Sequence, residues 1–359
     1  MGGGFGVEHR NLYDELCSFR NLELAYRKAR KGKRGKKPVQ KFESNLEQNI
    51  LNLKYELETF KYKPKPLRQF IIRDPKTRRI SASYFRDMVV HHALYNIIQP
   101  IFEKGFIYDS FANQINKGSS KAVERLNRFK RKVSVNGRII NKHRDNNMVA
   151  GYVLKADIKR FFDTIDHNIL MKIIKRKVED RNILILINQI IKNHISEIPG
   201  KGMPIGNLTS QFFANIYLNE LDHFMKHKLK ARYYIRYVDD FVVMGKSKSL
   251  LEGFKREIKI FMKALKLELH SDKTKVYPLC KGVNFLGFRI FYHYSLLSKK
   301  NIIGIRNRVE KFKVEYESGL MDSDDIERSL SGWLGYAMQA DTYKLRNEIQ
   351  EEFKNLKPL

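Results

Sequence analysis

Hydrophobic positions recur along this chain in two patterns, one with the spacing of a helix and one with the spacing of a strand. Helical spacing predicts helices over residues 8–30, 42–59, 85–103, 119–131, 167–195, 211–230 and 250–265, and mostly helical structure from Leu297 onward. Apolar runs of strand length predict strands over residues 68–80, 151–158, 233–245, 268–277 and 283–290, with a turn at Asp74-Pro75-Lys76 in the first. This interleaving predicts an α+β fold whose sheet contains antiparallel strands and is covered by helices.

Carboxylates interrupt two of the predicted strands. Tyr237-Val238-Asp239-Asp240 lies between apolar β-formers, and Asp157 ends another apolar strand. Burying adjacent carboxylates is costly unless a cation neutralises them, although an Asp-Asp pair standing alone is more often a solvated hairpin turn. Two acid-bearing strands favour a site for two divalent cations, one activating an attacking oxygen and one stabilising a leaving oxygen. Mg²⁺ prefers such oxygen ligands.

Charge points to a polyanionic partner. The 359 residues include 69 basic and 39 acidic side chains, a formal net charge of +30, and 42% of the residues are hydrophobic, enough for a substantial core. Lys and Arg replace condensed counterions on nucleic-acid phosphates, and the interleaved Tyr and Phe suit stacking on bases. A surface charged for solubility is the alternative. The basic segment 27–37 fits a solvated linker and a nucleic-acid contact equally well.

Cysteine usage and hydropathy bear on the compartment. Cys17 and Cys280 lack metal-ligand spacing, which predicts a reducing compartment and no zinc site. The N-terminus has no signal or myristoylation pattern. The longest apolar stretch, around residues 183–187, is too short to span a bilayer. We therefore expect a cytoplasmic protein that does not enter a membrane.

The carboxylate motifs resemble those of reverse transcriptases of the bacterial, group II intron-like kind. The resemblance covers about residues 60–345 and rests on residues 155–162, Lys-Ala-Asp-Ile-Lys-Arg-Phe-Phe, and on residues 237–240. It implies a right-hand polymerase fold with fingers, a palm containing an antiparallel sheet, and a helical thumb. The implied divisions are an N-terminal helical and basic extension at 1–60, fingers with part of the palm at 61–150, palm at 151–290 with fingers elements at about 167–205, and thumb at 291–359.

The resemblance also implies the chemistry. Asp157, Asp239 and Asp240 would be catalytic and, with the backbone carbonyl of Ile158, would hold two Mg²⁺ ions, which Mn²⁺ can replace. A primer 3′-hydroxyl would attack the α-phosphate of a deoxynucleotide, and pyrophosphate would leave. The implied partners are a template RNA, a DNA or cDNA primer and deoxynucleoside triphosphates (dNTPs).

Further residues follow from the same resemblance. The ring of Phe162 would exclude a 2′-hydroxyl, although a core aromatic is the plain alternative. The triphosphate needs cations away from the metals, and Lys273 is a candidate for protonating pyrophosphate. The candidate nucleotide-binding residues are Lys76, Arg79, Arg86, Phe162, Ile205, Gly206, Gln211 and Lys273, and the candidate primer grip is Phe285, Leu286 and Gly287.

One motif narrows the resemblance. Ile205-Gly206 and Ser210-Gln211 stand where most reverse transcriptases have Gln-Gly and Ser-Pro, and this pattern is similar to the enzymes of diversity-generating retroelements. That subfamily implies error-prone copying of template adenines, mutagenic retrohoming and a small basic accessory protein. Ser120 departs from the subfamily, which often has His there. A phage-defence or group II intron-like reverse transcriptase, and a non-catalytic RNA-binding scaffold with the same fold, remain open alternatives.

Overall fold

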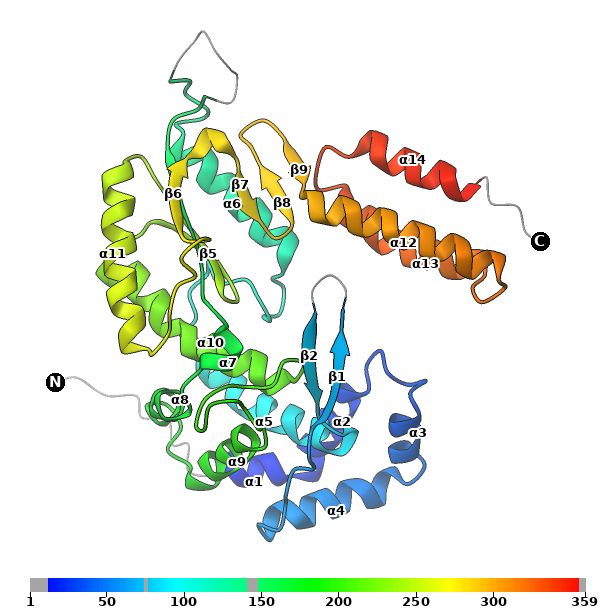
Figure 1. The fold of residues 1–359 in the computed structure, drawn as a ribbon. Helices are drawn as coiled ribbons and strands as arrows, with labels where there is room; N and C mark the ends of the chain where they lie inside the picture. Colours follow the sequence, from blue (N-terminus) through cyan, green and yellow to red (C-terminus); the bar gives the residue numbers. More distant parts are fainter. Residues whose placement is uncertain (1–11, 74–76, 141–147, 355–359) are drawn as a thin grey trace, which may run out of the picture. The chain divides into compact units, whose positions relative to one another are not determined.

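The computed structural model of the chain describes residues 12–73, 77–140 and 148–354 (Figure 1). The described residues form two compact units. Unit 1 holds those up to Asn113, with Asp157–Ala231 and Glu257–His270, and unit 2 holds those within Gln114–Ala156, Arg232–Arg256 and from Ser271 onward. The fold is α+β with antiparallel sheets, which confirms the predicted fold class.

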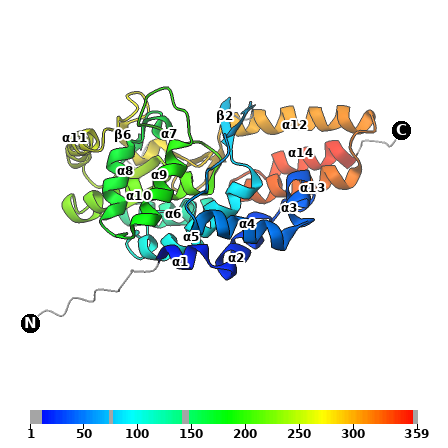
Figure 2. The same ribbon diagram turned by 90° about the horizontal axis from the view of Figure 1, so that it is seen from below.

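Unit 1 is mainly helical. Its helices are α1 (Leu12–Cys17), α2 (Phe19–Ala29), α3 (Lys37–Glu43), α4 (Leu46–Glu58), α5 (Phe85–Glu103), α7 (Phe161–Thr164), α8 (His167–Lys175), α9 (Arg181–Lys192) and α10 (Leu208–His223), which continues as the π-helix η1 (Phe224–Lys228). Helices α1, α2, α3 and α10 all pack on α5, and Figure 2 shows α1, α2 and α5 together. Buried residues cover most of the circumference of α5, including Val89, Val90, His91 and Leu94, as expected for a helix at the centre of the unit.

Two predicted helices are each interrupted by a capping residue. Ser18 divides residues 8–30 because its side chain accepts a hydrogen bond from the Asn21 backbone and starts α2. Asp180 divides residues 167–195 and caps α9 by accepting from the backbone N–H groups of Asn182 and Ile183. The prediction of one continuous helix in each segment was therefore wrong. Short polar side chains favour the first position of a helix over its interior.

Unit 1 also carries a hairpin of β1 (Arg68–Ile72) and β2 (Arg78–Ala82). The strands are antiparallel, with Arg68 opposite Ala82. The predicted turn at residues 74–76, which includes Lys76, lies outside the described residues. All of β1 is exposed, so packing alone holds this hairpin weakly.

The main sheet has the strand order β4-β5-β3-β6. Its strands are β3 (Tyr152–Asp157), β4 (Tyr233–Tyr237), β5 (Asp240–Gly245) and β6 (Lys275–Pro278), and β6 is followed by a short 3₁₀ helix, η2 (Leu279–Lys281). Helix α6 (Ser119–Val133) packs on β4 and β5, and α11 (Lys248–Ala264) follows β5. The strand predicted over 268–277 is shorter than expected, because regular pairing with β3 begins at Lys275.

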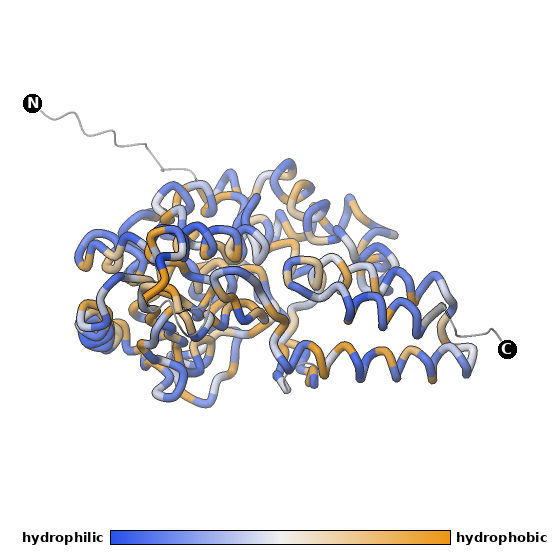
Figure 3. Tube along the Cα trace, turned by 90° about the horizontal axis from the view of Figure 1, so that it is seen from above, coloured by the Kyte–Doolittle hydropathy of each residue, from blue (hydrophilic) through white to orange (hydrophobic). Residues whose placement is uncertain are grey.

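The C-terminal part of unit 2 joins a three-stranded sheet to three helices. The strands are β7 (Val283–Phe285), β8 (Phe288–Ile290) and β9 (Ser295–Leu297), and the helices are α12 (Lys299–Glu317), α13 (Ser323–Ala337) and α14 (Tyr343–Lys354). Figure 3 shows hydrophobic and hydrophilic residues alternating along the helices nearest the C-terminus. Their apolar faces form a core of Ile305, Val309, Phe312, Ile326, Leu330 and Ile349, against which Trp333 packs.

A tight turn at Leu286-Gly287 connects β7 to β8. The hydropathy of residues 283–290 predicted one strand, whereas the resemblance of this segment to a primer grip implies the pair of strands that is found. Both residues have left-handed backbones, with φ of 51° and 86°. The Tyr336 hydroxyl donates to the Leu286 carbonyl at 3.0 Å, and the Asn301 amide donates to the Gly287 carbonyl at 3.2 Å. Helices α12 and α13 thus hold this turn by hydrogen bonds to its backbone.

Replacing Gly287 with Ala should destabilise unit 2 strongly. A Cβ there would overlap the Tyr336 hydroxyl and the Asn301 amide, on a backbone that side chains rarely adopt. We expect a loss of about 2 kcal/mol or more in the free energy of unfolding. The matched control is Gly304→Ala in α12, where a Cβ would meet no described atom within 4 Å and Ala should stabilise the helix by about 1 kcal/mol. Urea unfolding measures both, and equal values for the two variants would contradict the prediction.

Candidate active site

The Asp239-Asp240 motif forms the tip of the β4–β5 hairpin. Tyr237 pairs with Asp240, so Val238 and Asp239 make a two-residue turn. Val238 has a φ of 54°, a left-handed conformation that is costly for a β-branched residue. The Arg236 guanidinium, whose residue is 1% exposed, donates to the Val238 carbonyl at 3.0 Å. A buried cation therefore helps to hold a strained turn, as is common at functional sites.

Lys155 links the two acid-bearing strands. Strands β3 and β5 are neighbours in the sheet, and Lys155 Nζ forms an ion pair with the Asp240 carboxylate. The same ammonium lies 5.3 Å from the centre of the Phe285 ring. Alternate residues share one face of a strand, so Asp157 and Lys155 are on the same face of β3. Sequence reasoning gave Lys155 no role, because its partner Asp240 lies 85 positions further along the chain.

The segment after β3 is held by backbone hydrogen bonds within unit 1. The His270 N–H donates to the Asp157 carbonyl at 2.8 Å, and the Lys159 N–H donates to the Glu268 carbonyl at 2.8 Å. The Ile158 side chain between them is 1% exposed. The backbone that carries Asp157 and the Ile158 carbonyl is thus fixed in position.

The predicted metal ligands have the right chemistry for a divalent cation. Carboxylate and carbonyl oxygens of Asp157, Ile158, Asp239 and Asp240 are hard donors of the kind that Mg²⁺ prefers. Among residues 12–73, 77–140 and 148–354, however, no three Asp, Glu, His or Cys side chains form a group that could hold a metal ion. Asp240 instead carries its ion pair with Lys155. Metal binding by these residues therefore stays a prediction.

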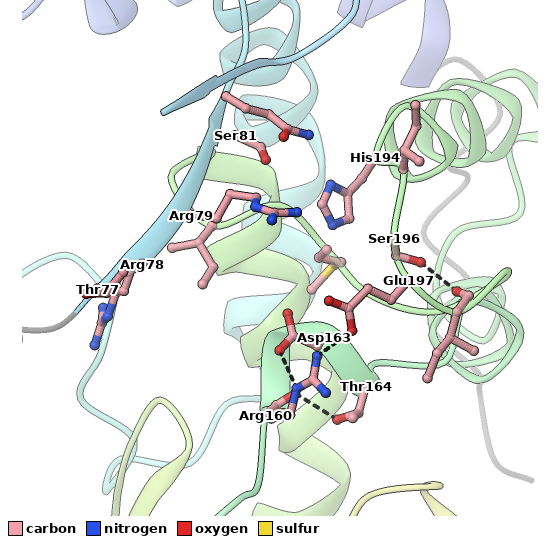
Figure 4. A pocket seen from close by; sticks show the side chains of 15 residues that line it. Thr77, Arg78, Arg79, Ser81, Arg160, Asp163, Thr164, His194, Ser196 and Glu197 are labelled. Carbon is pink, nitrogen blue, oxygen red and sulfur yellow. Dashed lines mark hydrogen bonds and ion pairs between the residues drawn. The ribbon is translucent and has the colours of Figure 1, made fainter. Parts of the chain in front are cut away.

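Unit 1 contains a hollow of about 400 Å³ between β2, the start of α7 and the loop that leads to α10 (Figure 4). Arg79 and Ile205, two of the predicted nucleotide-binding residues, both line it. Its other lining residues include Arg78, Arg160, Asp163, His194 and Glu197. The hollow therefore carries three arginines among polar and apolar residues.

One of these arginines, Arg160, is paired with two carboxylates. Arg160 donates to Glu197 at 2.8 Å and to Asp163 at 3.1 Å. The hydrogen bond from Arg160, and to a lesser degree the charge of Arg79, lowers the pKa of Glu197 below its usual value. Figure 4 shows Glu197 between these two arginines. Exposed ion pairs of this kind are weak, so an incoming anion can exchange with the carboxylates.

Three other predicted residues lie around this region of unit 1. Phe162 is half-buried in α7, and its carbonyl accepts from the Met203 N–H at 2.7 Å. Gly206 has a φ of 114°, and a Cβ there would lie 2.9 Å from Cγ2 of Ile80 in β2. Gln211 is half-buried in the first turn of α10. The loop before α10 is thus closely packed on both α7 and β2.

Arg86 lines a different hollow, of about 620 Å³, formed by α3, α4 and the start of α5. Its guanidinium forms ion pairs with Glu56 and Asp87 and lies 5.1 Å from the centre of the Tyr62 ring. Asp87 is 1% exposed, and burial raises its pKa above the usual value. Arg86 therefore serves as a counter-charge within unit 1. Lys273, the remaining described candidate, is exposed in the turn before β6 in unit 2.

The comparisons with known proteins identify the class. Residues 72–290 match the family model described as "Reverse transcriptase (RNA-dependent DNA polymerase)". This is more than half of the chain, and the chain belongs to the reverse transcriptase family. Among the described residues, no helix is long and apolar enough to cross a membrane.

The chain is also similar in sequence to individual proteins, one of them encoded by a group II intron. The chain is 26% identical over 291 residues to Protein YkfC of Escherichia coli (strain K12), a match covering 70% of this chain and 73% of YkfC. It is 24% identical over 315 residues to the group II intron-encoded protein LtrA of Lactococcus lactis subsp. cremoris, covering 68% of this chain but 50% of LtrA. Among solved structures, apo telomerase from Candida tropicalis matches with a TM-score of 0.49 and 13% identity, over 75% of this chain and 57% of that one.

Arg79 and Arg86 line different hollows, so we expect their replacement to have different effects. If Arg79 binds the triphosphate as the sequence predicts, Arg79→Ala should raise the KM for dNTP about tenfold or more, because a charged hydrogen-bond donor would be lost. Arg86→Ala should leave that KM nearly unchanged but lower the free energy of unfolding by about 3 kcal/mol, because buried Asp87 loses its counter-charge. Steady-state kinetics and urea unfolding separate the two effects. A large rise in KM for Arg86→Ala would show that it, too, acts on the nucleotide.

Proposed function

We propose that this chain is an RNA-directed DNA polymerase that makes cDNA on an RNA template. The observation that carries the proposal is the pairing of β3 and β5 in one sheet, linked by Lys155 and Asp240, within a domain of the reverse transcriptase family. If Asp239 and Asp240 formed only a solvated hairpin turn, they would not require β3, with its own carboxylate, as the neighbouring strand. The match spans about half the length of LtrA, so the activity of the whole protein is part of the proposal.

In this proposal Asp157, Asp239 and Asp240, with the Ile158 carbonyl, hold two Mg²⁺ ions, and Mn²⁺ can replace them. Bound divalent ions would activate the primer 3′-hydroxyl and stabilise the charge on the leaving oxygen. The strained turn at Val238 presents Asp239 at the tip of its hairpin. Lys155 balances the negative charge of Asp240 and so limits the repulsion between neighbouring carboxylates.

The remaining residues bind and orient the substrates. Arg79 lines the unit 1 hollow together with Arg160, and these two arginines would bind the triphosphate in place of Glu197. The Phe162 ring would exclude a 2′-hydroxyl, and the Ile205-Gly206 loop, with Gln211, would contact the templating base pair. The turn at Leu286-Gly287, with Phe285 beside it, would grip the primer end, and Lys273 would give a proton to pyrophosphate.

Replacing Asp239 with Ala tests the proposal. We expect Mg²⁺-dependent incorporation of dNTPs on an RNA template to fall by more than about 100-fold, since even outer-shell changes at metal sites cost 10–100-fold. The control is Asp324→Ala, which removes an exposed carboxylate in the first turn of α13. Synthesis that survives in Asp239→Ala would contradict the role assigned to this carboxylate in the metal site. Absence of synthesis from the unaltered chain under all metal conditions would favour the RNA-binding scaffold.

The finer proposal is that the enzyme serves a diversity-generating retroelement and copies template adenines with errors, in mutagenic retrohoming. Its support is the motif Ile205-Gly206 with Ser210-Gln211. Ile205 lines the unit 1 hollow, called the nucleotide hollow below, with an apolar side chain where an amide could hydrogen-bond. A small basic accessory protein would act with it. A phage-defence or group II intron-like role is the alternative, and relatives such as LtrA make it a real one.

Sequencing cDNA made on a defined RNA decides between these roles. We expect substitutions opposite template adenine to exceed those opposite the other bases about tenfold, the effect of roughly one hydrogen bond on discrimination. Ile205→Gln should reduce this excess, because it restores an amide at that position. A uniformly low error rate at all four bases would contradict the retroelement role and leave the polymerase proposal in place.

A further inference from the structure

Asn207 joins two walls of the nucleotide hollow. We infer that it is a positioning residue, which fastens the Ile205-Gly206 loop to β2 and thereby sets how tightly the triphosphate of the incoming nucleotide is held. This inference rests on the proposed polymerase function. Asn207 lies inside the motif of residues 205–211, and it is neither charged nor a metal ligand.

The side-chain amide of Asn207 is used at both ends. Its Nδ2 donates to the Ser81 carbonyl at 3.1 Å, and its Oδ1 accepts from the Ser83 N–H at 3.2 Å and from the Ser83 hydroxyl at 3.1 Å. Asn207 is 4% exposed, and Ser81 and Ser83 are 2% and 1% exposed. Buried amide hydrogen bonds of this kind are costly to break, because their partners cannot turn to water.

The Asn207 side chain does not cap its own helix. Asn207 is the N-cap of α10, with an extended backbone, and Asn at that position commonly accepts a bond from the first turn of its own helix. Among the described residues of α10, none gives the Asn207 side chain such a bond. The side chain instead reaches a strand more than 120 positions earlier in the sequence. Its hydrogen bonds therefore serve a long-range link between the loop and β2.

The hydrogen bonds of Asn207 connect β2 to the Ile205-Gly206 loop, and both would contact the incoming nucleotide. Ser81 also donates its N–H to the Ile205 carbonyl at 3.2 Å, so the loop runs beside the end of β2. Arg79 lies two residues before Ser81, on the same face of the strand, and both line the hollow with Ile205 (Figure 4). Since every residue of β1 is exposed, packing of β1 does little to fix Arg79. Asn207, together with the Ser81–Ile205 backbone hydrogen bond, therefore fixes the distance between the arginine and the loop.

If Asn207 only stabilised the fold, replacing it would lower stability without changing nucleotide binding. If it positions Arg79 and the loop, the KM for dNTP should change as well. In the full chain, Asn207→Ala should raise the KM for dNTP about tenfold, with kcat changed less than threefold. The dissociation constant of the RNA–DNA primer–template should stay unchanged, because that duplex does not depend on Arg79. Ser83→Ala removes one of the three bonds and should raise the KM by a smaller factor.

The matched control is Asn215→Ala, on the same helix. Asn215 is 1% exposed, and its amide donates to the Ala112 carbonyl at 2.9 Å. It should lower stability without moving the KM for dNTP. If Asn207→Ala does not fold, Ser83→Ala carries the test alone. An unchanged KM in the folded variants, or an equal rise in Asn215→Ala, would overturn the inference. Failure of the unaltered chain to incorporate dNTPs would instead remove the proposed function, and this inference with it.

Discussion

Negative charge at the end of a half-buried sheet needs a positive partner, and the main sheet of unit 2 depends on this constraint. Lys155 on β3 supplies the partner to Asp240 on β5. Arg236 stabilises the neighbouring turn, where Val238 takes a backbone conformation that its side chain disfavours. Without these cations, repulsion and desolvation would act against the hairpin. The same requirement explains why divalent ions would be favourable next to Asp157 and Asp239.

The sequence predicted elements well where one periodicity ran without interruption. Helix α5 has the predicted bounds, and β3 and the β4–β5 hairpin lie within a residue or two of theirs, because long buried faces leave a clear pattern. Prediction failed where a local interaction outweighs the pattern. Asp180 starts a new helix, and Leu286-Gly287 folds a predicted strand into a hairpin that β9 then extends. The proposed division into extension, fingers, palm and thumb stays a prediction.

The sequence predicted which residues line the candidate site better than it predicted their ion pairs and hydrogen bonds. Arg79 and Ile205 were both chosen from the sequence, and one hollow contains both. Arg86 looked equivalent to Arg79, yet its charge is taken up by Glu56 and Asp87 in another hollow. Lys155 and Asn207 were missed for the same reason, because their partners lie 85 and more than 120 positions away in the chain. Such pairings depend on tertiary structure, which spacing along the chain does not encode.

We propose that carboxylates distant in sequence bind the same divalent ions. Mn²⁺ binding to the full chain with its RNA–DNA primer–template, followed by electron paramagnetic resonance, tests this. We expect Asp157→Asn to weaken Mn²⁺ binding by at least about tenfold, as loss of a direct oxygen ligand should, and Asp239→Asn to do the same. Equal Mn²⁺ affinity in the unaltered chain and in both variants would contradict it.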